Sequence, residues 1–221
     1  MLNTGLNFDL MLPSLPFILG GVVVTLKFTI TSLLCGLPLA ILLAMMKIGS
    51  IRPLRVFANA YTSVFRGTPL LVQLALIYNI VPHLTGYNIT TFEAGVLAFS
   101  LNSAAYASEV IRGGIQSIDI GQWEAGHALG LSRFQTFHHV IMPLAIRIIL
   151  PNLVNEFINL LKESALVSTI GEADLLRRTQ IIAADKYLYF EPFIIAAAIY
   201  YIMVLIIAFI SKRLEKSLSY A

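Results

Sequence analysis

The amino-acid sequence predicts an all-α integral membrane protein with five transmembrane helices. Hydrophobic residues make up 57% of the 221 residues and charged residues only 12%, whereas a soluble domain typically carries about 25% charged residues. Five stretches are mostly apolar over roughly 20 residues, the length that an α-helix needs to cross a bilayer. The basic residues gather in segments that five spans would place on one side of the membrane. These observations exclude a soluble enzyme, and the net charge of +3 gives no reason to expect nucleic acid as a partner.

The five predicted spans follow one another in a single transmembrane domain over residues 1–221. They cover about residues 17–46, 56–81, 92–111, 140–161 and 192–210. The second span is broken by Arg66-Gly67-Thr68-Pro69, because proline lacks a backbone N–H and disfavours helical geometry before it. The fourth span is the least clear, since Pro143 and Pro151 interrupt it. The fifth contains no charged residue and is the clearest.

The distribution of lysine and arginine predicts the orientation of these spans. Cytoplasmic loops carry an excess of both residues. Three basic groups share one side of a five-span chain: Lys47, Arg52 and Arg55; Arg112 and Arg133; Lys212, Arg213 and Lys216. We therefore expect the N-terminus outside and the C-terminus inside. One external segment departs from the rule with Arg177, Arg178 and Lys186, whose charge is offset by Glu172, Asp174 and Asp185.

The predicted cytoplasmic loop, about residues 113–139, is too long for a simple connector and too short for a domain. Apolar residues recur in it at roughly helical spacing, which predicts short surface helices. They are Trp123, Ala125, Ala128, Leu129 and Leu131. A compact amphipathic element of this kind can dock a partner protein or lie on the lipid surface. The spacing alone does not distinguish these two roles.

The same loop resembles a signature of the membrane subunits of bacterial ABC importers. That signature is Glu-Ala-Ala, three residues, Gly, nine residues, Ile, one residue and Leu-Pro. The residues at the corresponding positions are Glu124, Ala125, Gly126, Gly130, Val140, Met142 and Pro143. In the family this loop forms a coupling helix that inserts into a cleft of the ATPase subunit. The resemblance thus implies an ATPase-coupling role for Glu124, Ala125, Gly126, Gly130 and Pro143.

Three further segments resemble the polar amino acid branch of these permeases. They are RGTPLLVQL (66–74), NSAAYASEVIRGGIQSI (102–118) and LLKESALVSTIGEADLLRRTQ (160–180). The resemblance implies a permease in the bacterial inner membrane with five spans and an external N-terminus. It also implies a second permease subunit, identical or related, a dimer of ATPase subunits and an extracytoplasmic substrate-binding protein. The sequence has no G-x-x-x-x-G-K-[ST] phosphate loop, so ATP and magnesium are expected on the ATPase and no cofactor on this chain.

Polar residues in the fourth predicted span are candidates for substrate binding, because polar groups at membrane depth are costly. Asn152, Glu156, Asn159 and Glu163 would form one stripe on a helix. We hypothesise that Glu156 binds the cationic group of arginine, lysine or histidine, with Asn102 and Asn159 as hydrogen-bonding groups. The alternatives are a helix–helix contact, pairing of Glu156 with an internal arginine, or a glutamine or other neutral amino acid substrate. Arg66 is expected to pair with an acid or to cap carbonyls at the break.

Three other classes of membrane protein fit the sequence less well. An ion-coupled secondary transporter usually contains an internal repeat, and no repeat is visible. An intramembrane enzyme needs a convergent set of catalytic side chains. The histidines that could contribute, His127, His138 and His139, lie outside the spans and lack the carboxylates of a metal site. A channel would not explain the long signature loop.

Overall fold

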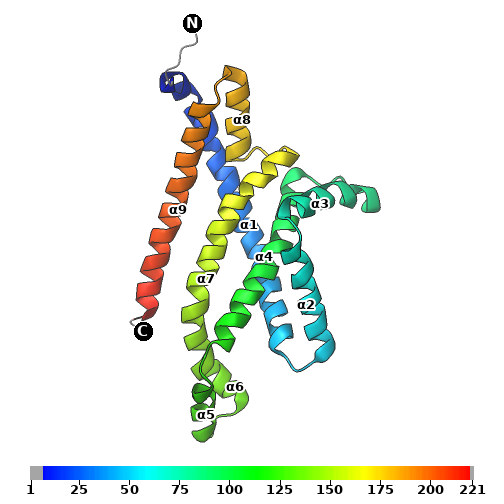
Figure 1. Ribbon diagram of the computed structural model, residues 1–221, viewed down its shortest axis with the longest axis vertical. Coiled ribbons are helices and arrows are strands. Elements are labelled where there is room, and N and C mark those ends of the chain that lie inside the picture. Colours follow the sequence, from blue (N-terminus) through cyan, green and yellow to red (C-terminus); the bar gives the residue numbers. More distant parts are fainter. Residues whose placement is uncertain (1–6, 220–221) are drawn as a thin grey trace.

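The computed structural model describes residues 7–219, and its described elements are all helical (Figure 1). The α-helices are α1 (Leu15–Ile48), α2 (Arg52–Gly67), α3 (Leu70–Thr85), α4 (Thr91–Gln116), α5 (Ile120–Ala128), α6 (Arg133–Thr136), α7 (Met142–Glu163), α8 (Leu175–Lys186) and α9 (Phe190–Ser219). The other helical elements in residues 7–219 are two 3-10 segments, Phe8–Ser14 and Ser164–Ile170, and a π-helical turn, Phe137–Ile141. Lys216 lies outside the described side chains, which end at Arg213.

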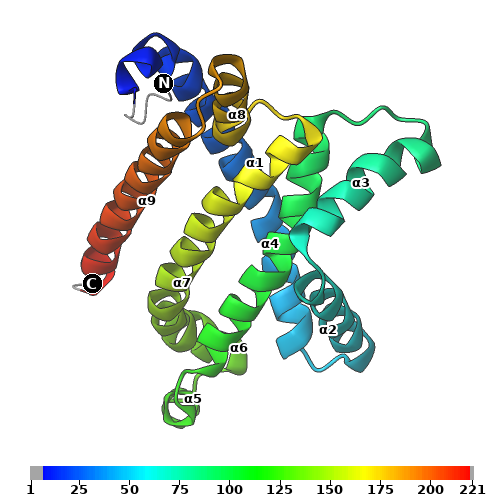
Figure 2. The same cartoon turned by 45° about the horizontal axis from the view of Figure 1, so that its top comes forward.

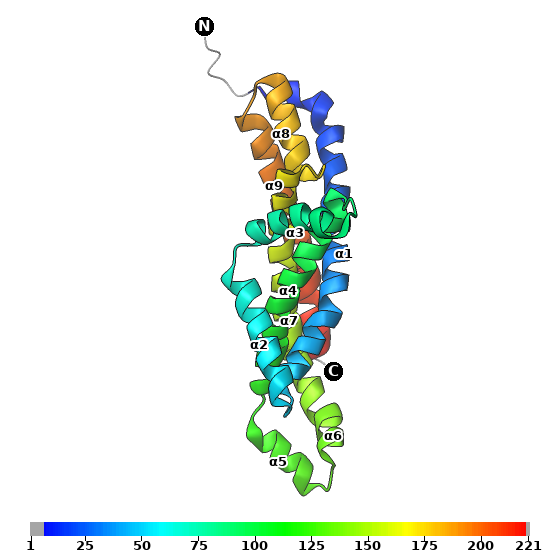
Figure 3. The ribbon, with the colours of Figure 1, turned by 90° about the vertical axis from the view of Figure 1, so that its right-hand side faces the viewer.

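Four long helices, α1, α4, α7 and α9, run along the length of the molecule (Figure 1). The short helices α5 and α6 project from one end, and α8 lies at the opposite end beside the start of α1. Helix α4 occupies the centre, since it contacts α1, α2, α3 and α7. Helix α3 lies across the other helices instead of along them, as Figures 2 and 3 show.

Three helical stretches in the described residues are long and apolar enough to cross a membrane: Phe8–Ile48, Arg133–Ile170 and Phe190–Arg213. The pair α2–α3 becomes a fourth if it is counted as one span, although its two halves are bent by 103°. Helix α4 is less apolar than these stretches. It lies in the centre and packs against four other helices through small and polar residues, which suit contacts between helices better than contacts with lipid. The fourth predicted span, described above as the least clear, is therefore long and apolar enough to cross a membrane. The third predicted span, which corresponds to α4, is not among these stretches.

Small residues let α1 and α4 pack closely. A Cβ atom on Gly36 of α1 would lie 2.5 Å from the Ser103 hydroxyl of α4. Nearby, the Ser100 hydroxyl donates a hydrogen bond to the Ser32 carbonyl at 3.0 Å. Further toward the α8 end, the buried Phe28 ring packs edge-on against Phe99, with centroids 4.9 Å apart. These contacts fix the central helix against the longest one.

The break between α2 and α3 is held by two side-chain amides. Gln73 donates hydrogen bonds to the carbonyls of Phe65 and Thr68 at 2.9 and 3.1 Å. Asn102 of α4 donates to the same Phe65 carbonyl and to the Gln73 side-chain oxygen, both at 3.0 Å. The expectation that Arg66 caps these carbonyls or pairs with an acid is wrong. Its guanidinium instead lies 5.3 Å from the centroid of the Tyr106 ring, and neutral amides cap the carbonyls at lower desolvation cost.

The basic residues that depart from the positive-inside pattern attach α8 to the beginning of the chain. Arg178 donates to the Phe17 carbonyl at 3.0 Å and stacks on the Phe17 ring. Lys186 donates to the Leu10 carbonyl at 2.8 Å. These contacts give both cations a structural function that does not depend on the side of the membrane they face.

Asp174 is a buried carboxyl at the N-cap of α8, and its titration should change the stability of this end of the fold. It accepts hydrogen bonds from the backbone N–H groups of Leu176 and Arg177 and from the Tyr200 hydroxyl. Burial nevertheless raises the pKa of Asp174 from 3.8 to about 6. Because the folded-state pKa is raised, the protonated form adds stability that is full below about pH 4 and is lost as the pH rises through 6.

When the pH is lowered from 7.5 to 5, protonation of Asp174 should raise the free energy of unfolding of the purified transporter by about 1–1.5 kcal/mol. Asp174→Asn should remove this gain and be at least as stable as the parent at pH 7.5, because an amide still accepts the capping hydrogen bonds without a buried charge. Thermal unfolding of both proteins across this pH range is the measurement. The same pH dependence in parent and variant would contradict the assignment.

Candidate functional site

A small polar pocket lies between α4 and α7, with a volume of about 130 Å³. Its lining residues are Asn102, Ser103 and Tyr106 of α4 and Glu156, Asn159, Leu160 and Glu163 of α7. The candidate substrate-binding residues Asn102, Glu156, Asn159 and Glu163 therefore line the same pocket. A second, larger cavity of about 390 Å³ adjoins it, shares Asn159 and Glu163, and is also lined by Lys162. The arrangement presents two carboxylates, two amides and two hydroxyls to one space.

The two carboxylates of the pocket are not neutralised by ion pairs. Within the described part of the chain, the ion pairs are Lys47–Glu109 and Arg112–Glu109. The guanidinium of Arg66 attracts Glu156 electrostatically but forms no ion pair with it. Two carboxylates that face one small pocket repel each other, and a cation bound between them would relieve that repulsion. The pairing of Glu156 with an internal arginine, which the sequence left open, is therefore not observed.

Asn102 has a structural function in addition to its place in the pocket. Its amide nitrogen uses two donors on the Phe65 carbonyl and the Gln73 side chain. An asparagine amide has two donors, so its side-chain oxygen is the atom left for a ligand. Asn102 thus connects the pocket directly to the break between α2 and α3.

The predicted polar stripe is longer than the pocket. Asn152 does not line it, and its side chain is exposed and donates to the Ile148 carbonyl one turn earlier at 2.8 Å. Asn152 and Glu163 are eleven residues apart, which corresponds to about 16 Å along a helix. The cavity reaches only the part of the stripe from Glu156 to Glu163.

A buried ion cluster near the ends of α1 and α4 was not predictable from the sequence alone. The distribution of basic residues places Lys47 in a cytoplasmic group after the first span, but only 5% of the residue is exposed. Its ammonium donates to Glu109 at 2.7 Å and to Ser108 at 3.0 Å, and Glu109 also pairs with Arg112. The spacing of Glu109 and Arg112 suits a pair on one helix, whereas the contact with Lys47 depends on the packing of two distant segments. The cluster joins α1 to α4 close to the projecting end.

Helices α5 and α6 form a hairpin, Ile120–Thr136, in the loop that carries the signature. Glu124 and Ala125 are exposed on α5, and Pro143 lies in the first turn of α7. Leu129 and Phe134, at the tip, are 80% and 76% exposed. Exposed apolar side chains of this size on a projecting element indicate a docking surface. The single tryptophan, Trp123, stacks on Phe137 with centroids 6.2 Å apart and holds α5 against the π-helical turn.

The structure explains why glycine occupies two positions of the signature. A Cβ atom on Gly126 would lie 2.5 Å from the Thr136 methyl group, so glycine allows α5 to pack closely on α6. Gly130 has φ +78°, a left-handed conformation that favours glycine. Its N–H donates to the His127 carbonyl, and that of Leu131 donates to the Gly126 carbonyl, which ends α5 sharply.

An apolar helical bundle, a polar pocket within it and a projecting hairpin with an apolar tip indicate a membrane protein with a candidate solute site and a candidate docking element. The sequence model of one family matches residues 36–220, and the chain belongs to this family, the binding-protein-dependent transport system inner membrane components. It is therefore a multi-pass inner membrane protein and a permease subunit of an ABC transporter, not an enzyme. In such transporters a separate chain hydrolyses ATP.

Relatives and solved structures agree with this assignment over nearly the whole chain. The putative glutamine transport system permease protein GlnP of Rickettsia conorii is 50% identical over 93% of this chain and 94% of its own. The arginine transport system permease protein ArtQ of Bacillus subtilis is 48% identical over 96% and 97%. The crystal structure of an amino acid ABC transporter with histidines superposes with a TM-score of 0.91 at 46% identity, covering 97% of this chain and 100% of that chain.

Proposed function

We propose that this chain is the permease subunit of an ATP-driven importer for polar amino acids, with five spans, an external N-terminus and a cytoplasmic C-terminus. Two such subunits, identical or related, would enclose one pathway, and this chain would form half of it. An ATPase dimer that binds ATP and magnesium would lie against the α5–α6 hairpin, and a substrate-binding protein would deliver the amino acid from outside. Two relatives are named as permeases for glutamine and for arginine, which supports an amino acid as the substrate.

The main support for this proposal is that the hairpin is joined at its two ends to the same two helices that line the pocket. The hairpin connects the end of α4 to the beginning of α7, and the pocket lies between α4 and α7. Closure of the ATPase dimer would move the hairpin, and rigid helices would transmit this movement to the walls of the pocket. Glu124, Ala125, Gly126, Gly130 and Pro143 are the residues proposed to couple the two events.

The pocket favours a substrate with a positive charge. Glu156 and Glu163 supply the negative charge, while Asn102 and Asn159 supply neutral hydrogen-bonding groups. This slightly favours arginine, lysine or histidine. Glutamine is the competing substrate, because every amino acid also carries an α-ammonium group that a carboxylate can bind. The relatives named for glutamine and for arginine support either substrate.

Replacing Glu156 by glutamine should lower arginine uptake on the order of tenfold, because a hydrogen bond to a charged group is worth about 1.5–3 kcal/mol. The measurement is uptake of arginine and of glutamine by vesicles that contain the complete transporter. If Glu156 binds the side-chain cation, glutamine uptake should be unchanged. If it binds the α-ammonium group, both should fall. Unchanged arginine uptake would contradict a role for Glu156 in substrate binding.

A matched pair of asparagines on α7 serves as the control. Asn159 lines the pocket, whereas Asn152 lies outside it and donates a hydrogen bond to the Ile148 carbonyl one turn earlier. Asn159→Ala should reduce uptake, and Asn152→Ala should leave it close to that of the parent. Equal effects would show that the polar stripe acts through helix packing and not through the pocket.

A further inference from the structure

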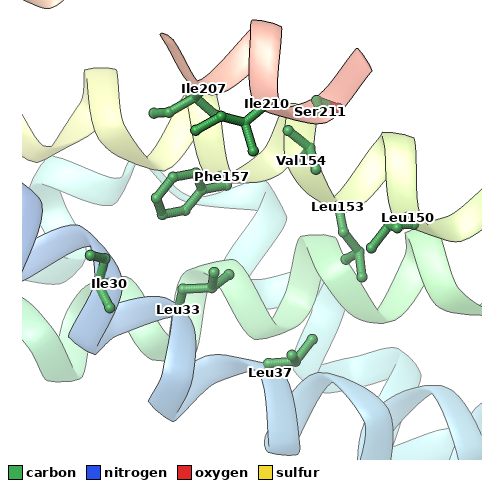
Figure 4. A pocket seen from close by; sticks show the side chains of 10 residues that line it. All are labelled: Ile30, Leu33, Leu37, Leu150, Leu153, Val154, Phe157, Ile207, Ile210 and Ser211. Carbon is green, nitrogen blue, oxygen red and sulfur yellow. The ribbon is translucent and has the colours of Figure 1, made fainter. Parts of the chain in front are cut away.

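An apolar groove lies between α1, α7 and α9, on a different side of α7 from the polar pocket. Its lining residues are Ile30, Leu33, Leu37, Leu150, Leu153, Val154, Phe157, Ile207, Ile210 and Ser211, around a volume of about 400 Å³. Figure 4 shows these side chains converging on one space from three helices. Ser211 is the only lining residue with a polar side chain, so the groove does not suit a polar amino acid. All three helices belong to stretches that qualify as membrane spans.

The groove has a basic end. Leu37, Leu150 and Ser211, one from each helix, lie toward the same end of it in Figure 4, which on α9 is the end closer to the C-terminus. Arg147 is three residues before Leu150, and the sequence Arg147, Leu150, Val154, Phe157 has the spacing of one helix stripe. Lys212 directly follows Ser211. Both cations are exposed, and neither forms a hydrogen bond or an ion pair with any residue in the described part of the chain.

The lining of the groove suits a hydrocarbon chain. It extends from Ile30 to Leu37 on α1 and from Leu150 to Phe157 on α7, which corresponds to about 10 Å along each helix. Part of an extended acyl chain can lie along an apolar surface of this length. Basic residues next to a membrane span attract anionic lipids by about 1 kcal/mol each.

We propose that this groove binds one anionic phospholipid, with an acyl chain between α1, α7 and α9 and the headgroup phosphate at Arg147 and Lys212. The lipid would come from the leaflet closer to the α5–α6 hairpin, since the basic end of the groove and the hairpin lie toward the same end of the molecule (Figure 1). Bound there, it would fill the space between α9 and the two helices α1 and α7.

The test uses the assembled transporter and two lipids with identical acyl chains, phosphatidylglycerol and phosphatidylcholine. Native mass spectrometry would count the lipids retained per copy of this chain. We expect one phosphatidylglycerol, lost in Val154→Trp because the indole fills the groove. The matched control Val23→Trp, on α1 at a position 67% exposed and outside the groove, should retain the lipid.

A second pair of variants tests the headgroup. Arg147→Gln should weaken phosphatidylglycerol binding about fivefold, as expected for the loss of one basic residue at a membrane surface, and leave phosphatidylcholine unaffected. Arg52→Gln, an exposed cation at the start of α2, should change neither. Equal lipid retention by Val154→Trp and Val23→Trp would overturn the proposal. Separation of the permease pair in Val154→Trp would overturn it as well, because the groove would then be a contact between protein subunits.

Discussion

Substrate-stimulated ATP hydrolysis should fall on the order of a hundredfold when Leu129 is replaced by aspartate. Leu129 is 80% exposed at the tip of the α5–α6 hairpin, and docking would bury it against the ATPase. A carboxylate buried at an apolar contact without a partner costs several kcal/mol. The measurement is ATPase activity of the reconstituted transporter with and without amino acid, together with co-purification of the two subunits.

Leu129→Met is the matched control, because methionine keeps the apolar character and nearly the volume of leucine. It should retain both the activity and the co-purification. If Leu129→Asp binds the ATPase and stimulates hydrolysis like the parent, the hairpin tip lies outside the subunit contact. The hairpin would then act as the interfacial helix that the sequence also allows.

Replacing Gly21 by alanine should destabilise the assembled protein by about 1–3 kcal/mol or more. Gly21 lies where α1 crosses the start of α8, and an added Cβ would be 2.6 Å from the Leu175 Cα and 2.7 Å from the Leu175 backbone nitrogen. Backbone atoms cannot rotate away as a side chain can. The Leu175 N–H also donates to the Thr25 hydroxyl at 3.2 Å, so a shift of α8 would weaken that hydrogen bond too. Thermal unfolding in detergent is the measurement.

Gly113→Ala provides the comparison, since Gly113 is a glycine within α4 whose added Cβ would meet nothing within 4 Å. Alanine there should leave stability unchanged or raise it by about 0.5–1 kcal/mol. If Gly21→Ala and Gly113→Ala unfold at the same temperature, the close contact between α1 and α8 does not exist in the protein as purified.

Local sequence patterns predicted an all-helical chain and the positions of its long helices. Apolar runs located α1, α7 and α9 because a membrane span needs a fixed length. Pro69 located the end of α2, because proline disfavours a helical conformation in the residue before it. The bend of 103° between α2 and α3 was not predictable, because it is fixed by amides on α3 and α4 that contact the Phe65 carbonyl from elsewhere in the chain.

The candidate site was predictable to the extent that it lies on one helix. Glu156, Asn159 and Glu163 share a stripe on α7, and helical periodicity alone places them together. The same periodicity extends the stripe to Asn152, which lies outside the pocket, because periodicity does not reveal where the opposing helix ends the cavity. The burial of Lys47 could not be predicted for a related reason, because its partners Ser108 and Glu109 are 61 and 62 residues away in the sequence.

The stacking of Trp123 on Phe137 gives the subunit a built-in optical reporter. The chain has one tryptophan, and it lies in the hairpin, not in the polar pocket between α4 and α7. The indole emission of this subunit therefore comes from the hairpin alone, without an attached dye. Its wavelength follows the local polarity, so the contact that orders α5 also makes the environment of the proposed docking surface directly observable.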